Sequence, residues 1–313
     1  MKKTKVVVTG GMGFIGSNVV ELLVAEGYDV HIIDDMSTAE EQQSYPFPIA
    51  AHNVIESRVA KEGCVLHTTS VNHSLRGILS GAKYVFHLAA HPRVEPSIQN
   101  PLPFHHENIN GSLNLFWACK EAGVEKIIFS SSSSVYGEPK SIPTKETDLL
   151  DPMSPYALHK LVGEQYLELF HKLYGVNSVS LRYFNVYGDR QPTKGSYVPV
   201  MGIFFRQLEE GRPLSVTGDG LQERDFVNVK DVASANLKAA LADLPSGHHA
   251  YNVGTGEARS IKEIAEYIHN DIKYIDPRFE PQTTCADISK AKQELGWEPK
   301  VDLFRWIAFS SPV

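Results

Sequence analysis

Thr9-Gly10-Gly11-Met12-Gly13-Phe14-Ile15-Gly16 is the stretch that decides the fold. It follows the apolar run Val6-Val7-Val8, which is typical of a strand buried on both faces. It leads into a helix that we expect to end near Gly27. Glycines at every third position allow bare backbone N–H groups to approach a pyrophosphate at the positive end of that helix. The stretch therefore predicts a dinucleotide site, and a plain glycine turn is the alternative.

A carboxylate follows at the distance that this interpretation requires. Asp34 stands roughly twenty residues further on, at the end of the predicted strand 30–33, where a carboxylate binds ribose hydroxyls. A negative side chain there repels a 2′-phosphate, and no arginine follows nearby. The sequence thus favours NAD over NADP as the cofactor, with Asp35 as a second candidate for the same role.

Strand and helix alternate through the first half of the chain. Further strands are predicted near 65–66 and at 84–88, 127–129 and 179–184, and a long helix over 101–122. Short helices are predicted at 200–210, 232–242 and 261–268. The pattern predicts an α/β protein with a Rossmann-type doubly wound parallel sheet and a smaller C-terminal α/β substrate-binding lobe. We expect residues 1–185 to form the NAD-binding domain and residues 186–313 mainly the second lobe, with some segments returning to the first domain.

Composition narrows the class of protein. The chain has 313 residues, of which 42% are hydrophobic and 21% charged, enough for one large domain or two closely packed lobes. A formal net charge of −7 argues against a general nucleic-acid binder. The three cysteines are scattered and odd in number, which favours reduced thiols, and the apolar run after the basic start is too short for a signal peptide or a membrane span. A cytoplasmic protein is expected.

Tyr156 and Lys160 lie four residues apart, so a helix places a phenol and an ammonium on one face. Ser154 can cap that helix, Pro155 can fill its first turn, and Gly175 can end it. Beside a nicotinamide such a pair makes a general base. A half-buried aromatic residue next to a solvated lysine is the alternative for a lone Tyr-x-x-x-Lys motif.

Five serines, 130–134, follow the predicted strand 127–129 and precede Val135-Tyr136-Gly137, so they lie at the carboxyl end of a strand, where open parallel sheets bind ligands. Together with the glycine turn and the Tyr-Lys pair, this order resembles the extended short-chain dehydrogenase/reductase family over nearly the whole chain. The nearest likeness is to the NAD-dependent nucleotide-sugar epimerases of the UDP-glucose 4-epimerase type. The motifs that carry the resemblance are 9–16, 86–90, 108–111, 130–137, 156–160, 181–185, 224–227 and 252–256.

The resemblance implies Ser132, Tyr156 and Lys160 as catalytic residues. Tyr156 would take the proton from the sugar 4-hydroxyl while hydride passes from sugar C4 to NAD. The 4-keto sugar would then turn over and take the hydride back on its other face, with Ser132 relaying or stabilising the proton. Relatives that dehydrate or decarboxylate usually carry an acid where this chain has Ser133-Ser134, so the serines favour an epimerase.

The resemblance also implies ligand contacts. The residues that it places around the cofactor are Gly10, Gly13, Phe14, Ile15, Gly16, Asp34, Asp35, Leu88, Ala89, Ala90, Asn108, Tyr156, Lys160 and Tyr183, with Asn108 supporting the active-site backbone or a water. The residues that it places around the substrate are Arg93, Ser132, Asn185, Thr217, Arg224, Glu280 and Thr284. Within the second set, Asn185 and Arg224 match contacts to the nucleotide diphosphate, and Glu280 stands in the place of a ribose-binding acid. For Arg224, a surface ion pair is the alternative.

The sugar is left open. By the resemblance, Thr284 stands where bulk limits the group at sugar C2, and because threonine is small the N-acetylhexosamine forms are candidate substrates beside glucose and galactose. Arg93 lies on a loop that faces the hexose in relatives, so a uronate carboxylate is the alternative, as is a solvated arginine. A net oxidoreductase acting on a nucleotide sugar and a non-catalytic NAD sensor remain as competing functions.

Two further expectations concern metals and assembly. The thirteen histidines lack the companion carboxylates or cysteines of a metal site, so no metal is expected. The helix near 110–122 and the Tyr156 helix resemble the pair that forms a four-helix dimer contact in the family, so a homodimer is expected. No nucleic-acid or membrane partner is expected.

Overall fold

The central element of the computed structural model, which describes residues 3–37, 57–59, 64–92, 94–194, 198–277 and 280–311, is an eight-stranded sheet. Its strand order is β11-β7-β6-β5-β1-β2-β4-β3, and all pairs are parallel except β3 with β4. The strands are β1 (Lys5–Thr9), β2 (Asp29–Asp34), β3 (Ser57–Val59), β4 (Cys64–Thr68), β5 (Tyr84–His87), β6 (Lys126–Ser132), β7 (Ser178–Tyr183) and β11 (His248–Val253). The predicted doubly wound α/β class is confirmed.

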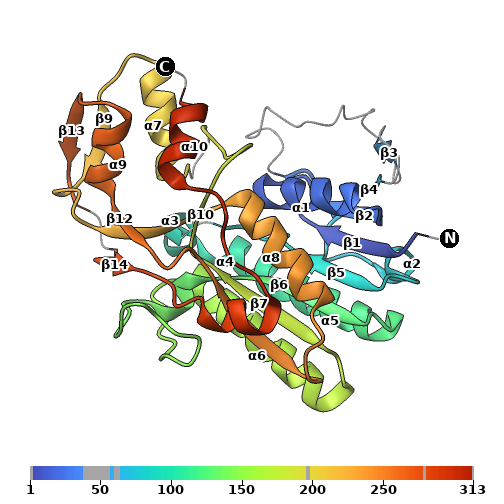
Figure 1. The fold of residues 1–313 in the computed structure, drawn as a ribbon. Helices are drawn as coiled ribbons and strands as arrows, with labels where there is room; N and C mark the ends of the chain where they lie inside the picture. The colour runs from blue at the N-terminus through green and yellow to red at the C-terminus, as the bar shows by residue number, and fades with distance from the viewer. Residues whose placement is uncertain are drawn as a thin grey trace.

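Helices cover both faces of this sheet (Figure 1). Because successive side chains of a strand point to opposite faces, Val6 and Val8 enter one core cluster and Val7 the other, and all three are fully buried. The first cluster includes residues of α1 (Phe14–Ala25) and α8 (Val229–Leu241). The second includes residues of α2 (Arg76–Leu79), α5 (Gly111–Ala122) and α6 (Pro155–Tyr174).

The strand order reverses at β1. The chain passes from β1 outward to β2, and then returns to place β5 on the other side of β1. Ligands of open α/β sheets bind at such a switch point, beyond the carboxyl ends of the strands. The glycine stretch 9–16 lies at this point.

A smaller lobe lies toward the carboxyl ends of these strands (Figure 1). Its core brings together Phe204 of α7, Val216 of β9 and Ile264 of α9. Strands β8, β10, β12 and β14 form one sheet, and β9 pairs with β13. The elements of this lobe are β8 (Asn185–Tyr187), α7 (Val200–Glu209), β9 (Leu214–Thr217), β10 (Glu223–Asn228), β12 (Ala258–Ser260), α9 (Ile261–Ile268), β13 (Ile272–Ile275), β14 (Thr283–Thr284) and α10 (Leu303–Ser310).

The helix predicted over 101–122 spans those residues without a gap but is not α-helical throughout. It consists of α4 (Pro101–His105), a π-helical turn η2 (His106–Asn110) and α5. A preceding helix, α3 (Val94–Gln99), was not predicted. π-turns inside helices are frequent at functional sites because they re-aim a side chain. Here the turn carries Asn108.

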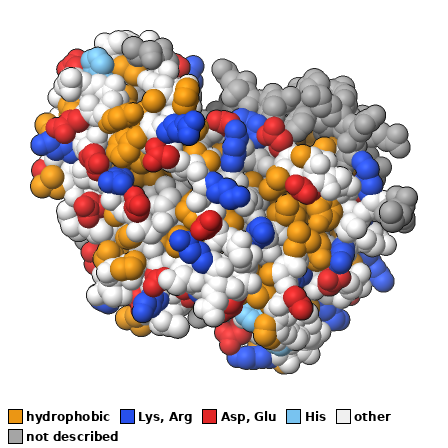
Figure 2. All heavy atoms as spheres, in the orientation of Figure 1, with side chains coloured by type: hydrophobic (Ala, Val, Ile, Leu, Met, Phe, Trp, Pro, Cys, Tyr) orange, Lys and Arg blue, Asp and Glu red, His pale blue; other side chains and the backbone are white. Residues whose placement is uncertain are grey.

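The surface gives little further guidance. On the face drawn in Figure 2, basic and acidic side chains of the described residues are interspersed rather than gathered by sign. No helix in the described part of the chain is long and apolar enough to cross a bilayer. Within the same residues, no group of three or more His, Cys, Asp or Glu side chains is placed to hold a metal ion.

Candidate functional site

The glycine stretch forms a close-packed turn between β1 and α1. Gly10 has a φ of +66°, and a Cβ there would lie 2.6 Å from the backbone nitrogen of Ala89. A Cβ on Gly16 would lie 2.0 Å from the carbonyl oxygen of Gly10. Gly13 caps α1 without any side-chain hydrogen bond, and Phe14 and Ile15 begin the helix. The uncapped helix end therefore presents its N–H groups and positive dipole to an anion.

Asp34 closes this turn from the end of β2. Its Oδ2 accepts a hydrogen bond from the Met12 N–H at 2.9 Å, and its Oδ1 accepts one from the Met36 N–H at 2.9 Å. Burial raises the pKa of Asp34, and the two N–H donors oppose that rise. Asp35 is exposed and accepts from the Ser37 N–H. Asp34 is thus the carboxylate fixed against the glycine turn.

Leu88, Ala89 and Ala90 follow β5 and border the same turn. The Leu88 N–H donates to the Thr9 carbonyl at 3.1 Å, and the Ala89 N–H donates to the Thr9 hydroxyl at 3.2 Å. Position 10 must be glycine because the backbone of Ala89 lies directly against it.

Tyr156 and Lys160 lie in the first two turns of α6. Ser154 caps the helix, accepting from the Ala157 N–H at 3.1 Å, as its position in the sequence predicts. The Lys160 ammonium donates to the carbonyl oxygen of Ser130 at 2.7 Å and lies 5.8 Å from the centre of the Tyr156 ring. Burial lowers the pKa of Lys160 to about 8. The phenol and the cation are thus neighbours, and the cation is tied to the end of β6.

Ser132 is the last residue of β6 and caps the 3₁₀ turn η3 (Ser133–Tyr136), against which α6 packs. Its hydroxyl oxygen accepts from the Ser134 N–H at 3.2 Å and from the Ser134 hydroxyl at 2.9 Å. Because Lys160 is bonded two residues earlier on the same strand, the structure brings the ends of β6 and α6 together. The catalytic roles of Ser132, Tyr156 and Lys160 stay a prediction.

The side chain of Asn108 forms its hydrogen bonds with the backbone of His91. Its side-chain oxygen accepts from the His91 N–H at 2.8 Å, and its amide donates to the His91 carbonyl at 3.1 Å. The expected support of the active-site backbone by Asn108 stays a prediction. The Tyr183 hydroxyl is turned inward onto Ser130 at 3.1 Å and onto Asn236 of α8. Burial raises the pKa of Tyr183 to about 12, and its expected contact with the cofactor stays a prediction.

Three candidate substrate residues share the small sheet. Asn185 on β8 pairs in register with Phe226 of β10, and Thr284 on β14 pairs in register with Arg224 of β10. The Thr284 hydroxyl oxygen is buried and has no hydrogen-bond partner among the described residues. Asn185, Arg224 and Thr284, which are far apart in the chain, are therefore brought together in one sheet.

Arg224 and Glu280 bind each other. One Arg224 amino group lies 2.7 Å from the Glu280 carboxylate, and the other donates to the backbone carbonyls of Glu223 and Gln282. Only 8% of the arginine side chain is exposed, so it is not the surface pair with Asp225 or Asp231 that was the alternative. Arg224 and Glu280, which the resemblance places around the same substrate, thus form an ion pair with each other.

Two other candidates are less informative. The Thr217 hydroxyl, at the end of β9, accepts from the side chain of Gln222 at 2.7 Å. Arg93 lies outside the described residues.

A buried ion pair beneath the serines escaped the sequence analysis. Glu164 and Arg182 lie 2.6 Å apart, and the Ser131 hydroxyl donates to Glu164 at 2.5 Å. The sequence did carry one signal for Glu164, because positions 156, 160 and 164 are four residues apart and therefore lie on one face of the helix.

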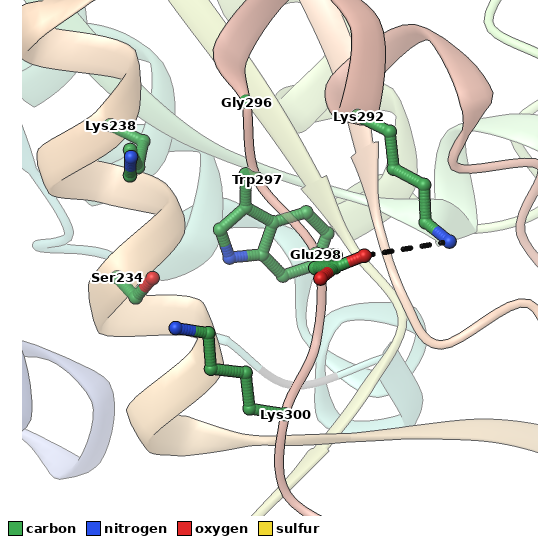
Figure 3. Close-up of a pocket in the computed structure, with 7 residues that line it drawn as sticks. All are labelled: Ser234, Lys238, Lys292, Gly296, Trp297, Glu298 and Lys300. Carbon is green, nitrogen blue, oxygen red and sulfur yellow. Dashed lines mark ion pairs between the residues drawn. The ribbon is translucent and has the colours of Figure 1, made fainter.

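A separate cavity of about 320 Å³ lies between α8 and the segment that follows the π-turn η4 (Ala291–Leu295) (Figure 3). None of the predicted site residues lines it. Its lining residues are Ser234, Lys238, Lys292, Gly296, Trp297, Glu298 and Lys300. The lysines are exposed. The Lys292 ammonium lies 4.0 Å from the Glu298 carboxylate, which is typical of a solvated surface ion pair.

A doubly wound sheet with a glycine turn at its switch point and a Tyr-Lys pair at a neighbouring strand end defines a dinucleotide-dependent protein of the short-chain dehydrogenase/reductase class. The chain belongs to the NAD dependent epimerase/dehydratase family, whose model matches residues 6–254. Its cofactor is NAD. The glycine turn fits that group, since no side chain caps the start of α1 and its N–H groups are left for a pyrophosphate, and Asp34 suits a ribose without a 2′-phosphate.

Known proteins similar to this chain include several sugar-nucleotide epimerases. The putative UDP-glucose 4-epimerase of Methanocaldococcus jannaschii is 36% identical over 95% of this chain and 94% of the relative. The UDP-N-acetylglucosamine 4-epimerase of Methanobrevibacter ruminantium M1, solved with UDP-N-acetylmuramic acid, is 36% identical with a TM-score of 0.86 over 99% of both chains. The Thermus thermophilus UDP-glucose 4-epimerase, solved with NAD, is 32% identical with a TM-score of 0.83 over 97% of this chain and 96% of that one.

Proposed function

We propose that this chain is a UDP-sugar 4-epimerase. The observation that carries the proposal is the buried Lys160 ammonium, bonded to the Ser130 carbonyl at 2.7 Å and 5.8 Å from the Tyr156 ring, at the strand ends beside the glycine turn. The similarity to epimerases over nearly the full length of the chain supports it.

In the proposed mechanism, the glycine turn and Asp34 would hold NAD, which would supply reversible hydride transfer at sugar C4. Tyr156 takes the proton of the sugar 4-hydroxyl at its phenol oxygen and gives it back at the end of the cycle. The Lys160 ammonium stabilises the phenolate by its charge. Ser132 donates a hydrogen bond to the 4-oxygen, where negative charge is spread during the transfer. Asn108 keeps the backbone of the β5 loop in place through its two bonds to His91.

We propose the small lobe, mainly residues 186–313, as the substrate lobe. Arg224 would bind the diphosphate, since a guanidinium fork suits phosphate oxygens, and Glu280 would then be free to accept from ribose hydroxyls. Asn185, Thr217 and Thr284 would complete this side of the pocket. The ion pair seen here would hold both side chains near their working positions before the substrate arrives.

The test is a direct assay. Purified protein is mixed separately with UDP-glucose, UDP-N-acetylglucosamine and UDP-glucuronate, and each reaction is analysed by chromatography for the 4-epimer. We expect one or more epimers to form without added cofactor and without net change in absorbance at the NADH wavelength. Stoichiometric NADH formation would indicate a net oxidoreductase, and no product from any sugar would contradict the proposal.

The Lys160 charge predicts a pH dependence. Because burial lowers the pKa of Lys160 to about 8, the ammonium is present below that pH and is lost as the pH rises through it. We expect kcat/KM to fall above pH 8, by about tenfold for each pH unit once the ammonium is mostly lost. A Lys160→Arg variant keeps its charge, so it should be less active but lack this alkaline limb. An identical limb in both proteins would exclude Lys160 as its source.

The Arg224 assignment predicts a change in substrate binding. Arg224→Gln should raise KM for the UDP-sugar by about ten- to a hundredfold, because a charge-assisted hydrogen bond to the diphosphate is lost, while kcat changes little. Steady-state kinetics measures both constants. Arg212→Gln is the control, since Arg212 is exposed and pairs only with Glu210 among the described residues. An unchanged KM in Arg224→Gln would show that the diphosphate binds elsewhere.

We also propose a homodimer formed through α5 and α6. Leu158, Leu169 and Leu173 form an exposed apolar stripe along α6, beside the exposed Trp117 of α5. We expect light scattering to report twice the chain mass, and Leu169→Glu with Leu173→Glu to give monomers. The control is Leu241→Glu, an equally exposed leucine on α8. A monomeric wild-type chain would exclude the dimer.

A further inference from the structure

The end of β6 that carries Ser132 has no apolar side chain. Beyond Phe129 the strand consists of Ser130, Ser131 and Ser132, so no apolar side chain holds it. Backbone pairing with β7 continues to Ser132, and the serine hydroxyls add side-chain bonds to that pairing. Because side chains alternate along a strand, Ser130 and Ser131 point to opposite faces.

Each face offers one partner. On the α8 face, the Ser130 hydroxyl meets the Tyr183 hydroxyl at 3.1 Å. On the α6 face, the Ser131 hydroxyl donates to Glu164 Oε1 at 2.5 Å. Ser131 is 2% exposed and Glu164 is 5% exposed, so water does not compete for this bond.

Glu164 is itself held firmly. Arg182 of β7 donates to it from Nε at 3.0 Å and from Nη2 at 2.6 Å, which is a bidentate fork. The remaining Arg182 nitrogen donates to the Tyr136 hydroxyl at 2.8 Å, and Tyr136 donates to Asn252 of β11 at 2.6 Å. The Glu164 carboxylate is therefore held in one position relative to the sheet.

The same carboxylate lies on the catalytic helix. Glu164 follows Lys160 by one turn and Tyr156 by two, so any shift of Glu164 moves the helix face that carries both. Neighbouring Gly163 allows α6 to lie directly on β6, since a Cβ there would be 2.5 Å from the Phe129 ring. Through its bond from Ser131, Glu164 thus connects α6, which carries Tyr156 and Lys160, to the end of β6.

We propose that Glu164 is a positioning residue, which fixes the Ser132 end of β6 relative to the Tyr156 and Lys160 end of α6 by accepting the Ser131 hydroxyl bond. The inference rests on the proposed function, because positioning matters only if these three side chains act on one substrate. Glu164 itself touches neither substrate nor cofactor in this account.

The experiment removes the link and spares the ion pair. Removing Glu164 would leave the buried Arg182 charge uncompensated and could unfold the chain. Ser131→Ala deletes only the hydroxyl, and Ser131→Thr restores one. Ser180→Ala is the matched control, because Ser180 is a buried serine of β7 whose hydroxyl has no partner among the described residues.

In epimerase assays of the full chain, we expect Ser131→Ala to lower kcat by about ten- to a hundredfold with unchanged KM, because small misplacements of catalytic groups cost about that much. Ser131→Thr should recover most of the loss, and Ser180→Ala should match the wild type. A wild-type kcat in Ser131→Ala, or a loss shared equally by Ser180→Ala, would overturn the proposal.

A second measurement needs no turnover. Hydrogen–deuterium exchange of the same proteins should show faster exchange at residues 132–137 and 155–162 in Ser131→Ala only. If the wild type epimerises no UDP-sugar, the proposed function fails and this exchange pattern alone decides the inference. Exchange identical to the wild type in both segments would overturn it.

Discussion

A Tyr156→Phe variant is expected to lose about a hundred- to ten-thousandfold in kcat, because it lacks the phenol oxygen that moves the proton of the sugar 4-hydroxyl. KM should change little, since binding is assigned to the small lobe. NAD content should also stay near that of the wild type, because the glycine turn is unaltered. Steady-state kinetics and the absorbance of cofactor released from denatured protein measure these three quantities.

Tyr166→Phe is the matched control. Tyr166 lies on the same helix, partly buried against the second core cluster, and has no place in the proposed chemistry. It should retain wild-type kcat. Equal activity in Tyr156→Phe and Tyr166→Phe would mean that another group moves the proton.

A Gly16→Ala variant is expected to lose its cofactor. The added Cβ would lie 2.0 Å from the Gly10 carbonyl oxygen, so the turn must open and the N–H groups at the start of α1 must move. Overpacking at a tight site costs about 1–3 kcal/mol, which corresponds to about a five- to 160-fold weaker affinity for NAD. Calorimetric titration of the apoprotein with NAD measures the affinity.

Gly77→Ala separates this effect from a general intolerance of alanine. Gly77 lies in α2, and a Cβ there would meet no atom within 4 Å. NAD affinity and thermal midpoint should both match the wild type in this control. Normal NAD affinity in Gly16→Ala would show that the cofactor does not rest on the glycine turn.

The sequence was sufficient for six of the eight strands of the large sheet, because their signals are local, whereas β3 and β11 were not predicted. The apolar strand, the glycine spacing and the carboxylate of Asp34 all follow one another within a single βαβ unit. The capped helix of Tyr156 and Lys160 is equally local, since Ser154 and Gly175 mark its two ends. Such features need no knowledge of distant residues.

Features that depend on distant partners were not predictable in this way. The π-turn at Asn108 depends on the backbone of residue 91, and the Arg224–Glu280 pair joins residues 56 positions apart. The small sheet includes β14, which has only 2 residues and therefore leaves no periodic pattern in the sequence. The bond between the Tyr183 hydroxyl and Asn236 likewise depends on α8 packing on the sheet.

The most direct test of the account follows the hydrogen at sugar C4. A UDP-sugar that the chain epimerises is prepared with deuterium at C4 and incubated with the protein in ordinary water, without added NAD. The proposed chemistry removes this atom as hydride and returns it to the opposite face, so mass spectrometry and NMR should find the 4-epimer with deuterium retained at C4. An epimer that carries solvent hydrogen at C4 would contradict the account.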